Sequence, residues 1–150
     1  MAIARGAGTE IIRAHHIEAI DSSNRTLIFG VQHHIYTVLS IIVNAYVIQA
    51  AGNYIHCKIL GYDAGPGGAT AQEITIFMQD MTLNSTFVWN DKFSFNGNEP
   101  VDFSANIDSI VKQDAIADQG SAVAQKLLAS TENGSDAFDI TCTFLDQNNA

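Results

Sequence analysis

Residues 35–47 read Ile-Tyr-Thr-Val-Leu-Ser-Ile-Ile-Val-Asn-Ala-Tyr-Val, and this stretch decides the fold class. Its odd-numbered positions are nearly all apolar, whereas the even-numbered positions include Tyr36, Ser40, Asn44 and Tyr46. Side chains alternate between the two faces of a strand, and β-branched and aromatic residues favour a pleated, half-buried surface. The stretch is therefore predicted to be the central strand of an antiparallel sandwich, with its odd-numbered side chains on the core.

A membrane helix is the rival interpretation of this region. No Asp, Glu, Lys or Arg occurs between Thr26 and Cys57. A membrane span needs about 20 mainly apolar residues. The apolar segment 35–51 is shorter than this, no Lys or Arg cluster flanks it, and four polar residues interrupt it: Thr37, Ser40, Asn44 and Gln49. The strand is therefore favoured, and no association with a membrane is expected.

The composition indicates a folded domain rather than a disordered chain. The protein has 150 residues, of which 47% are hydrophobic and 15% are charged. This length is typical of one domain, and the hydrophobic content is sufficient for a core. A surface with so few charges also suits a protein that packs against neighbours.

The net charge of −9 is unevenly distributed along the chain. Residues 1–60 contain four Arg or Lys against three Asp or Glu (+1), and residues 61–150 contain three against thirteen (−10). Nucleic-acid binding depends on basic side chains that neutralise phosphates. The chain is therefore not expected to bind nucleic acid.

Short alternating segments separated by turns predict an all-β fold. Residues 1–8 are small and Gly-containing and are expected to form a flexible N-terminal arm, with a single domain over 9–150. Strands are expected at 9–20, 26–32, 35–47, 54–62, 73–79, 86–89, 92–95, 125–130 and 137–145. About eight short strands of this kind favour an antiparallel jelly-roll-like β-sandwich, and barrel and Greek-key variants stay open.

Residues 99–120 break the strand pattern. Ile107, Ile110, Val111 and Ala115 recur at helical spacing, which predicts one short helical insertion at the edge of the sandwich. The two aromatic segments before it, 86–89 and 92–95, are interpreted as short strands on either side of a tight turn.

The cysteines and the N-terminus bear on the compartment. Cys57 and Cys142 each lie among apolar residues of the same parity, which predicts two inward-facing free thiols, although a disulfide stays open. The first residues lack the long apolar segment of a signal peptide, so synthesis in a cytoplasm is expected.

The histidine pairs His15-His16 and His33-His34, together with His56, are candidate metal ligands. Neighbours in a strand point to opposite faces, so one pair cannot chelate one ion, but one histidine from each pair could meet across strands. No carboxylate or cysteine lies at ligand spacing, so surface or interface histidines are the preferred interpretation, and no metal is assigned.

Other candidate chemistry is weaker still. The acidic residues between 90 and 118 lack a calcium-loop pattern, and a solvated acidic loop is preferred. No nucleophile elbow, phosphate-binding loop or dinucleotide fingerprint occurs. We therefore expect a non-enzyme, with no catalytic residue and no cofactor. Tyr54, Tyr62, Phe87 and Trp89 could form a sugar-binding platform, although core packing explains at least the Phe and Trp better.

The order of the segments resembles structural modules of tailed bacteriophages. The segments that carry the resemblance are 36–45, 54–60, the run Met-Thr-Leu-Asn-Ser-Thr-Phe-Val-Trp-Asn-Asp-Lys-Phe-Ser-Phe-Asn-Gly at 81–97, 127–131 and 138–147. The resemblance spans about residues 26–146 and departs from the pattern at 99–120, which is longer than the pattern needs. Such small sandwiches decorate or cement capsids, or build tail and fibre attachments.

The resemblance implies a virion structural protein, most simply a capsid decoration (cement) protein that stabilises the head through neighbouring capsid subunits. Its expected partners are the major capsid protein or other virion proteins, and it is expected to be a homo-oligomer, with a trimer favoured. A tail, baseplate or fibre-adaptor component and a carbohydrate-binding lectin-like module are the alternatives. The candidate partner contacts are Ala2, Ile3, Ala4, Arg5, Arg13, Asp102, Ile107, Ile110 and Asp114.

Overall fold

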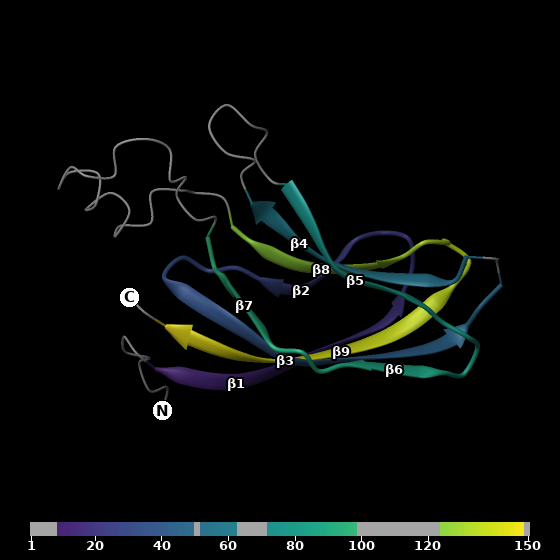
Figure 1. Cartoon of the computed structure of the whole chain (residues 1–150), viewed down its shortest axis with the longest axis horizontal. Coiled ribbons are helices and arrows are strands. Elements are labelled where there is room, and N and C mark those ends of the chain that lie inside the picture. Colours follow the sequence, from purple (N-terminus) through teal and green to yellow (C-terminus); the bar gives the residue numbers. More distant parts are fainter. Residues whose placement is uncertain (1–8, 50–51, 63–71, 99–123, 149–150) are drawn as a thin grey trace.

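The structure of the protein, a computed structural model, describes residues 9–49, 52–62, 72–98 and 124–148. These residues form two antiparallel sheets that face each other, as the two layers in Figure 1 show. The strands are β1 (Glu10–Ile20), β2 (Arg25–Phe29), β3 (His34–Val47), β4 (Tyr54–Tyr62), β5 (Gln72–Asp80), β6 (Thr86–Trp89), β7 (Phe93–Asn96), β8 (Lys126–Thr131) and β9 (Ala137–Asn148). The all-β prediction is confirmed.

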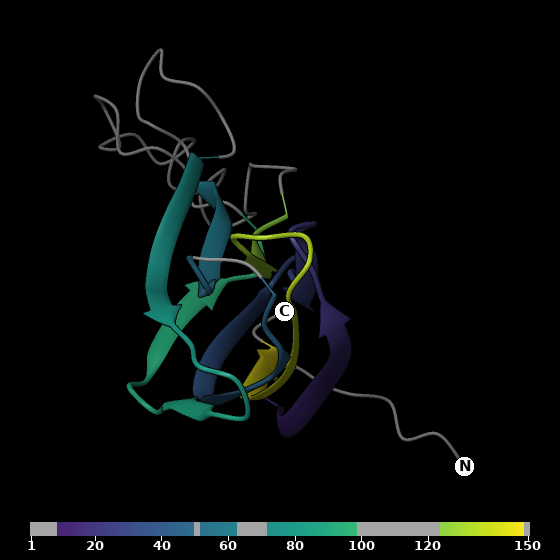
Figure 2. The same cartoon turned by 90° about the vertical axis from the view of Figure 1, so that its right-hand side faces the viewer.

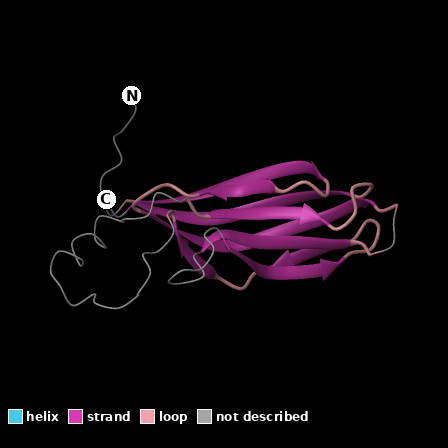
Figure 3. Ribbon diagram, turned by 90° about the horizontal axis from the view of Figure 1, so that it is seen from above, coloured by secondary structure: helices cyan, strands magenta, loops and turns pink. Residues whose placement is uncertain are grey.

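The chain crosses between the two sheets at most of its connections, and only β4–β5 and β6–β7 stay within one sheet. One sheet has the order β1-β9-β3-β6, with β7 also paired to β3, and the other has the order β2-β8-β4-β5. Figure 2 shows the two layers from the end, and in Figure 3 the described part of the chain consists of strands and loops without a helix. β1 is an edge strand of the first sheet, and β2 is an edge strand of the second. The two strands contact each other, so they lie on the same flank of the sandwich.

The stretch at 35–47 is the central strand, as predicted, but the prediction of its buried face is wrong for the first half. Tyr36 and Val38 are buried there, whereas Ile41, Val43 and Ala45 are buried further along. The change of parity comes from a β-bulge, because the register against β9 shifts between Val38 and Ser40. An extra residue in one strand exchanges its two faces beyond that point.

The two short aromatic strands are present, but they do not fold back on each other. Both pair antiparallel with β3: β6 lies against Ile41–Asn44 and β7 against Ile35–Val38. They therefore follow one another along β3, and the break between them lies beside the bulge. The shared parity of their aromatic residues is explained by packing, because all four contribute to the core: Phe87, Trp89, Phe93 and Phe95.

The core lies between the inner faces of the two sheets. Phe77 of β5 packs against Phe87 and Trp89 of β6, each with a ring-centroid distance of 5.3 Å. Phe87 and Trp89 pack against the core, as predicted, rather than forming the alternative sugar-binding platform. Cys57 and Cys142 are buried free thiols on opposite sheets, which confirms the prediction for both cysteines.

The backbones of Gly30, Gly97 and Gln125 pack tightly at one end of the sandwich. Gly30 N donates to Gln125 O (2.7 Å), and Gln125 N donates to Gly97 O (2.9 Å). A Cβ at Gly30 or at Gly97 would overlap a neighbouring carbonyl group, so both positions require glycine. This contact fixes the segment that follows β2, where Val31 lies.

Two expectations lie outside the described residues: the flexible arm at 1–8 and the helical insertion at 99–120. The ends that flank the second segment meet, because Asn98 and Ala124 form an antiparallel bridge. Within the part of the chain that the structure describes, no helix is long and apolar enough to cross a membrane.

Candidate functional site

A pocket of about 340 Å³ lies on the flank of the sandwich between β1 and β2. Side chains of β1, β2, β3 and β9 line it, together with Val31 from the segment that follows β2. The two sheets are tied together here by His15, whose Nδ1 lies 2.9 Å from the backbone oxygen of Leu27. The pocket thus forms where a long edge strand of one sheet meets a short edge strand of the other.

The register of β1 on β9 places Arg13 and His15 on the inner side of this flank. Arg13 pairs with Phe144 and His15 with Cys142, and both of these partners are buried. Arg13 and His15 are themselves exposed, because β1 is the edge strand and the sandwich ends beside it. Polar side chains on the inward parity are tolerated at such an open edge, where water can reach them.

A buried carboxylate organises the polar side of the pocket. The side chain of Asp146 is only 5% exposed, and its Oδ1 lies 2.6 Å from His34 Nδ1. Its Oδ2 lies 3.1 Å from Arg13 Nε. A buried carboxylate is costly unless it is paired and hydrogen-bonded. The contacts with Arg13 and His34 therefore allow Asp146 to occupy an inner position, and they hold both side chains at the pocket.

The remaining wall of the pocket is apolar and aromatic. Leu27, Ile28, Phe144 and the ring of Tyr36 contribute buried surface. Tyr36 is fixed from two sides, since its hydroxyl oxygen accepts from Val31 N (3.1 Å) and its ring stacks on His34 with a centroid distance of 6.0 Å.

Large apolar side chains are exposed at the rim of the pocket. Phe29 is 60% exposed and Val31 is 50% exposed. Phe29 also carries the Lys126 ammonium over its ring, at 4.9 Å from the centroid. An apolar wall with a few placed polar groups is the usual character of a ligand pocket.

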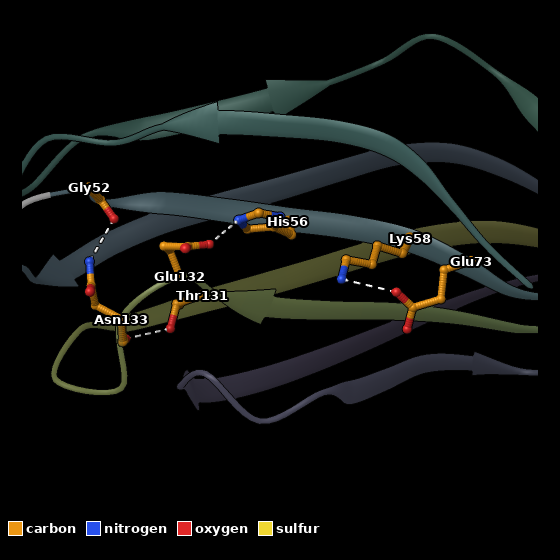
Figure 4. A network of polar contacts seen from close by, with 7 residues as sticks. All are labelled: Gly52, His56, Lys58, Glu73, Thr131, Glu132 and Asn133. Carbon is orange, nitrogen blue, oxygen red and sulfur yellow. Dashed lines mark hydrogen bonds and ion pairs between the residues drawn. The ribbon is translucent and has the colours of Figure 1, made fainter.

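A second polar cluster lies on the outer face of the other sheet, and Figure 4 shows its contacts. His56 Nε2 lies 2.9 Å from Glu132 Oε2, and Lys58 Nζ lies 3.2 Å from Glu73 Oε2. Asn133 Nδ2 donates to Gly52 O (2.6 Å), and Thr131 donates to Asn133 O (2.7 Å). These contacts tie β4, β5 and the β8–β9 turn together, so we interpret this cluster as structural.

The structure places one predicted contact residue, Arg13, at the pocket. The other candidates lie outside the described residues: Ala2, Ile3, Ala4, Arg5, Asp102, Ile107, Ile110 and Asp114. Asp146 was not among the residues predicted from the sequence, and His34 was named there only as a candidate metal ligand. A signal for Asp146 was present, because it continues the inward parity of Phe138, Ile140, Cys142 and Phe144.

The histidines are only partly where they were expected. His34 and His56 have side chains that are 18% and 16% exposed, and each contacts a carboxylate, so both are held within the fold rather than fully exposed. One histidine from each pair, His15 and His34, does line the same pocket. Among the described residues, however, no group of three His, Cys, Asp or Glu is placed to hold a metal ion.

Neither thiol offers an accessible nucleophile at neutral pH. Burial raises the pKa of the Cys142 thiol to about 12, and burial together with the nearby Cys142 raises the pKa of Cys57 further. Both groups are therefore protonated and shielded from solvent. The pocket instead offers hydrogen-bond donors and apolar surface, which suit binding.

Comparison with known proteins gives no family. No family model matches the chain, and no curated protein matches it. One similar solved structure is described as "Bacillus endospore appendages form a novel family of disulfide-linked pili". It has 10% sequence identity and a TM-score of 0.41, and the match covers 100% of this chain and 97% of that chain. A likeness this low carries no argument about the function of this protein.

Proposed function

We propose that this chain is a non-enzymatic structural protein of a phage virion, and that it decorates the capsid and stabilises the head by binding neighbouring capsid subunits. The resemblance to structural modules of tailed bacteriophages supports the assignment to a virion. An exposed apolar stripe on the five-stranded sheet supports the binding role. The proposal includes a jelly-roll connectivity, a short helical insertion at 99–120 and assembly as a homo-oligomer, with a trimer favoured.

The apolar stripe is the observation that carries the proposal. Ile42 of β3 lies directly opposite Val88 of β6, and these side chains are 42% and 51% exposed. Tyr46, further along β3, is 40% exposed. Asn44 and Thr86, which hydrogen-bond to each other, lie on this face between the Ile42–Val88 pair and Tyr46. Exposed apolar side chains grouped in this way are typical of surfaces that pack against a partner.

The surroundings of the stripe favour a protein partner. The neighbouring positions of β9 on the same face are Asp139, Thr141 and Thr143, of which only Asp139 is charged. Covering this face would therefore bury few charges, whose desolvation opposes association. A capsid offers many symmetric copies of one site, so even modest individual contacts gain strength when an oligomer binds several of them.

The strand order supports the jelly-roll part of the proposal. The chain crosses between the two sheets at every connection except β4–β5 and β6–β7. The strand β9 lies between β1 and β3, and β8 lies between β2 and β4. This arrangement is the one expected when two Greek keys are wrapped into a double sheet.

The test combines light scattering with co-sedimentation on purified capsids lacking this protein. The expected result is a stable oligomer that sediments with capsids in a fixed ratio to capsid subunits. The variant Val88→Lys should lower capsid occupancy, because it places a charge in the stripe. The matched control Met78→Lys alters a side chain that is 54% exposed on the other sheet, and it should bind as the wild type does.

A monomer that does not bind capsids would contradict the decoration role. It would favour the alternative of a tail, baseplate or fibre-adaptor component, which is present in far fewer copies per particle. Equal loss of binding in both Lys variants would contradict the assignment to the stripe. Circular dichroism of both variants separates either result from misfolding.

A further inference from the structure

We propose that the pocket between β1 and β2 binds a carboxylate that is carried on an apolar group. This proposal is independent of the proposed function, because it concerns the opposite flank from the apolar stripe of β3 and β6 and rests on the contacts of Arg13, His34 and Asp146.

The charge of Asp146 is already engaged within the protein. His34 Nδ1 contacts one carboxylate oxygen at 2.6 Å, and Arg13 Nε contacts the other at 3.1 Å. A cationic ligand would have to displace one of these contacts to reach the carboxylate. The buried acid therefore acts as a support that orients Arg13 and His34, and the pocket does not favour a cation.

Arg13 supplies the donors for an anion. A guanidinium carries five N–H donors in a planar fork, and the contact with Asp146 is made through Nε. The Arg13 side chain is 53% exposed and lines the pocket, so its terminal N–H groups can be reached from outside. Such groups bind carboxylates in a bidentate manner, with hydrogen bonds that are stronger than neutral ones.

The apolar wall selects what carries the carboxylate. Leu27, Ile28 and Phe144 form the inner side, and the exposed Phe29 and Val31 form the rim. The pocket volume is about 340 Å³, and a cavity of about 150 Å³ is enough to hold benzene. One aromatic or branched aliphatic group with its carboxylate therefore fits.

The charge distribution favours an anion at this flank over the rest of the surface. Residues 1–60, which supply β1, β2 and β3, have a net charge of +1, whereas residues 61–150 have −10. Most of the pocket lining, including Arg13, therefore comes from the less acidic part of the chain, which favours an anion there.

The first experiment is a titration of the ¹⁵N-labelled full-length protein, followed by its amide resonances. The probes are phenylacetate, 2-phenylethanol and 2-phenylethylamine, which share a benzyl group and differ in charge. Phenylacetate should shift the Arg13, His34 and Asp146 amides in a saturable way. The alcohol and the amine should bind on the order of tenfold more weakly, because they lack the charge-assisted bond. Equal binding of alcohol and acid, or no saturable shift with any probe, would overturn the proposal.

A second pair of probes distinguishes two sources of the same chemistry. An acetylated tetrapeptide that ends in phenylalanine with a free carboxylate is compared with its C-terminal amide. Tighter binding of the peptide acid than of phenylacetate assigns the pocket to the chain terminus of another protein. Tighter binding of phenylacetate assigns it to a free organic acid. Equal affinity of the peptide acid and its amide would contradict recognition of a carboxylate.

Variants locate the interaction. Arg13→Gln should weaken phenylacetate binding by on the order of tenfold, since it removes the guanidinium. Arg13→Lys keeps the charge beside Asp146 and guards against misfolding, and it should bind more weakly than the wild type because it lacks the planar fork. Arg25→Gln changes an exposed arginine of β2 that does not line the pocket and should leave binding unchanged. Unchanged binding by Arg13→Gln would overturn the assignment.

Discussion

His34 Nδ1 lies 2.6 Å from Asp146 Oδ1, although 112 positions separate the two residues in the chain. The contact joins the beginning of β3 to the end of β9, which are neighbouring strands in the five-stranded sheet. Arg13 of β1 contacts the second carboxylate oxygen, so a single acid links the three strands at this edge. The cluster therefore contributes to stability as well as to the pocket.

Replacing Asp146 by alanine should destabilise the fold. The change removes the acceptor of both Arg13 and His34, and hydrogen bonds to charged groups contribute about 1.5–3 kcal/mol each. Because Arg13 is half exposed and can turn to water, we expect a total loss of about 2 kcal/mol in the free energy of unfolding. Urea denaturation measures it, with the exposed Asp91→Ala as the matched control. A change no larger than that of the control would contradict a structural role for the cluster.

The positions of the strands were predictable because their alternation is local. Residues 86–89 were predicted as a strand with the bounds that β6 has, and residues 54–62 with those of β4. The inward face of β3 was not predictable in the same way. The bulge at Leu39 depends on how β3 aligns with β9 and on the break between β6 and β7, which are contacts between distant segments.

The pocket was predictable in part for the same reason. Arg13 was a candidate contact residue, and the inward parity of Asp146 could be read from the last strand. The contact between Arg13 and Asp146 could not be predicted, because it depends on the register of β1 on β9. In this register Ile11 lies opposite Asp146, and Arg13, two residues further along β1, reaches Asp146 diagonally. Register is set by the packing of whole sheets, and no local sequence signal specifies it here.

Gly97→Ala should be strongly destabilising. A Cβ at this position would overlap the backbone carbonyl of Val31, which cannot move without disturbing the hydrogen bond from His34 N to Val31 O (3.1 Å). Forced overpacking costs about 1–3 kcal/mol or more, and we expect the upper end of this range because the obstacle is backbone. Gly134→Ala is the control, because its nearest contact is the mobile Ser22 hydroxyl at 3.1 Å. Thermal unfolding of both variants tests this, and similar melting temperatures would contradict it.

The buried thiols should make the protein sensitive to alkaline pH. The thiol pKa is 9.0 when exposed and is raised by burial in the fold, to about 12 for Cys142. Above pH 9 the unfolded chain releases these protons while the folded chain retains them, so stability is complete below pH 9 and falls as pH rises towards 12. Each thiol lowers the free energy of unfolding by about 1.4 kcal/mol per pH unit in this interval.

Urea denaturation at several pH values between 8 and 10.5 measures this slope. The control is the double variant Cys57→Ala, Cys142→Ala, which lacks both thiols and keeps every other titratable group. The wild type should lose stability with pH more steeply than the double variant. Parallel slopes would show that the thiols do not contribute, and reaction of the native protein with a thiol reagent at pH 8 would contradict their burial.

Removal of residues 1–8 should separate folding from assembly. The described strands begin at Glu10, and the core residues nearest to the start of the chain are Ile17 and Ile20. The shortened protein should therefore unfold at nearly the same urea concentration as the full chain. The candidate contacts Ala2, Ile3, Ala4 and Arg5, predicted from the sequence, lie in this arm. Occupancy on purified capsids should therefore fall, because each copy loses contact area, although the apolar pair Ile42 and Val88 is retained. Replacing Arg5 alone by glutamine tests the charge of the arm at full length, and full occupancy by the shortened protein would exclude the arm as a contact element.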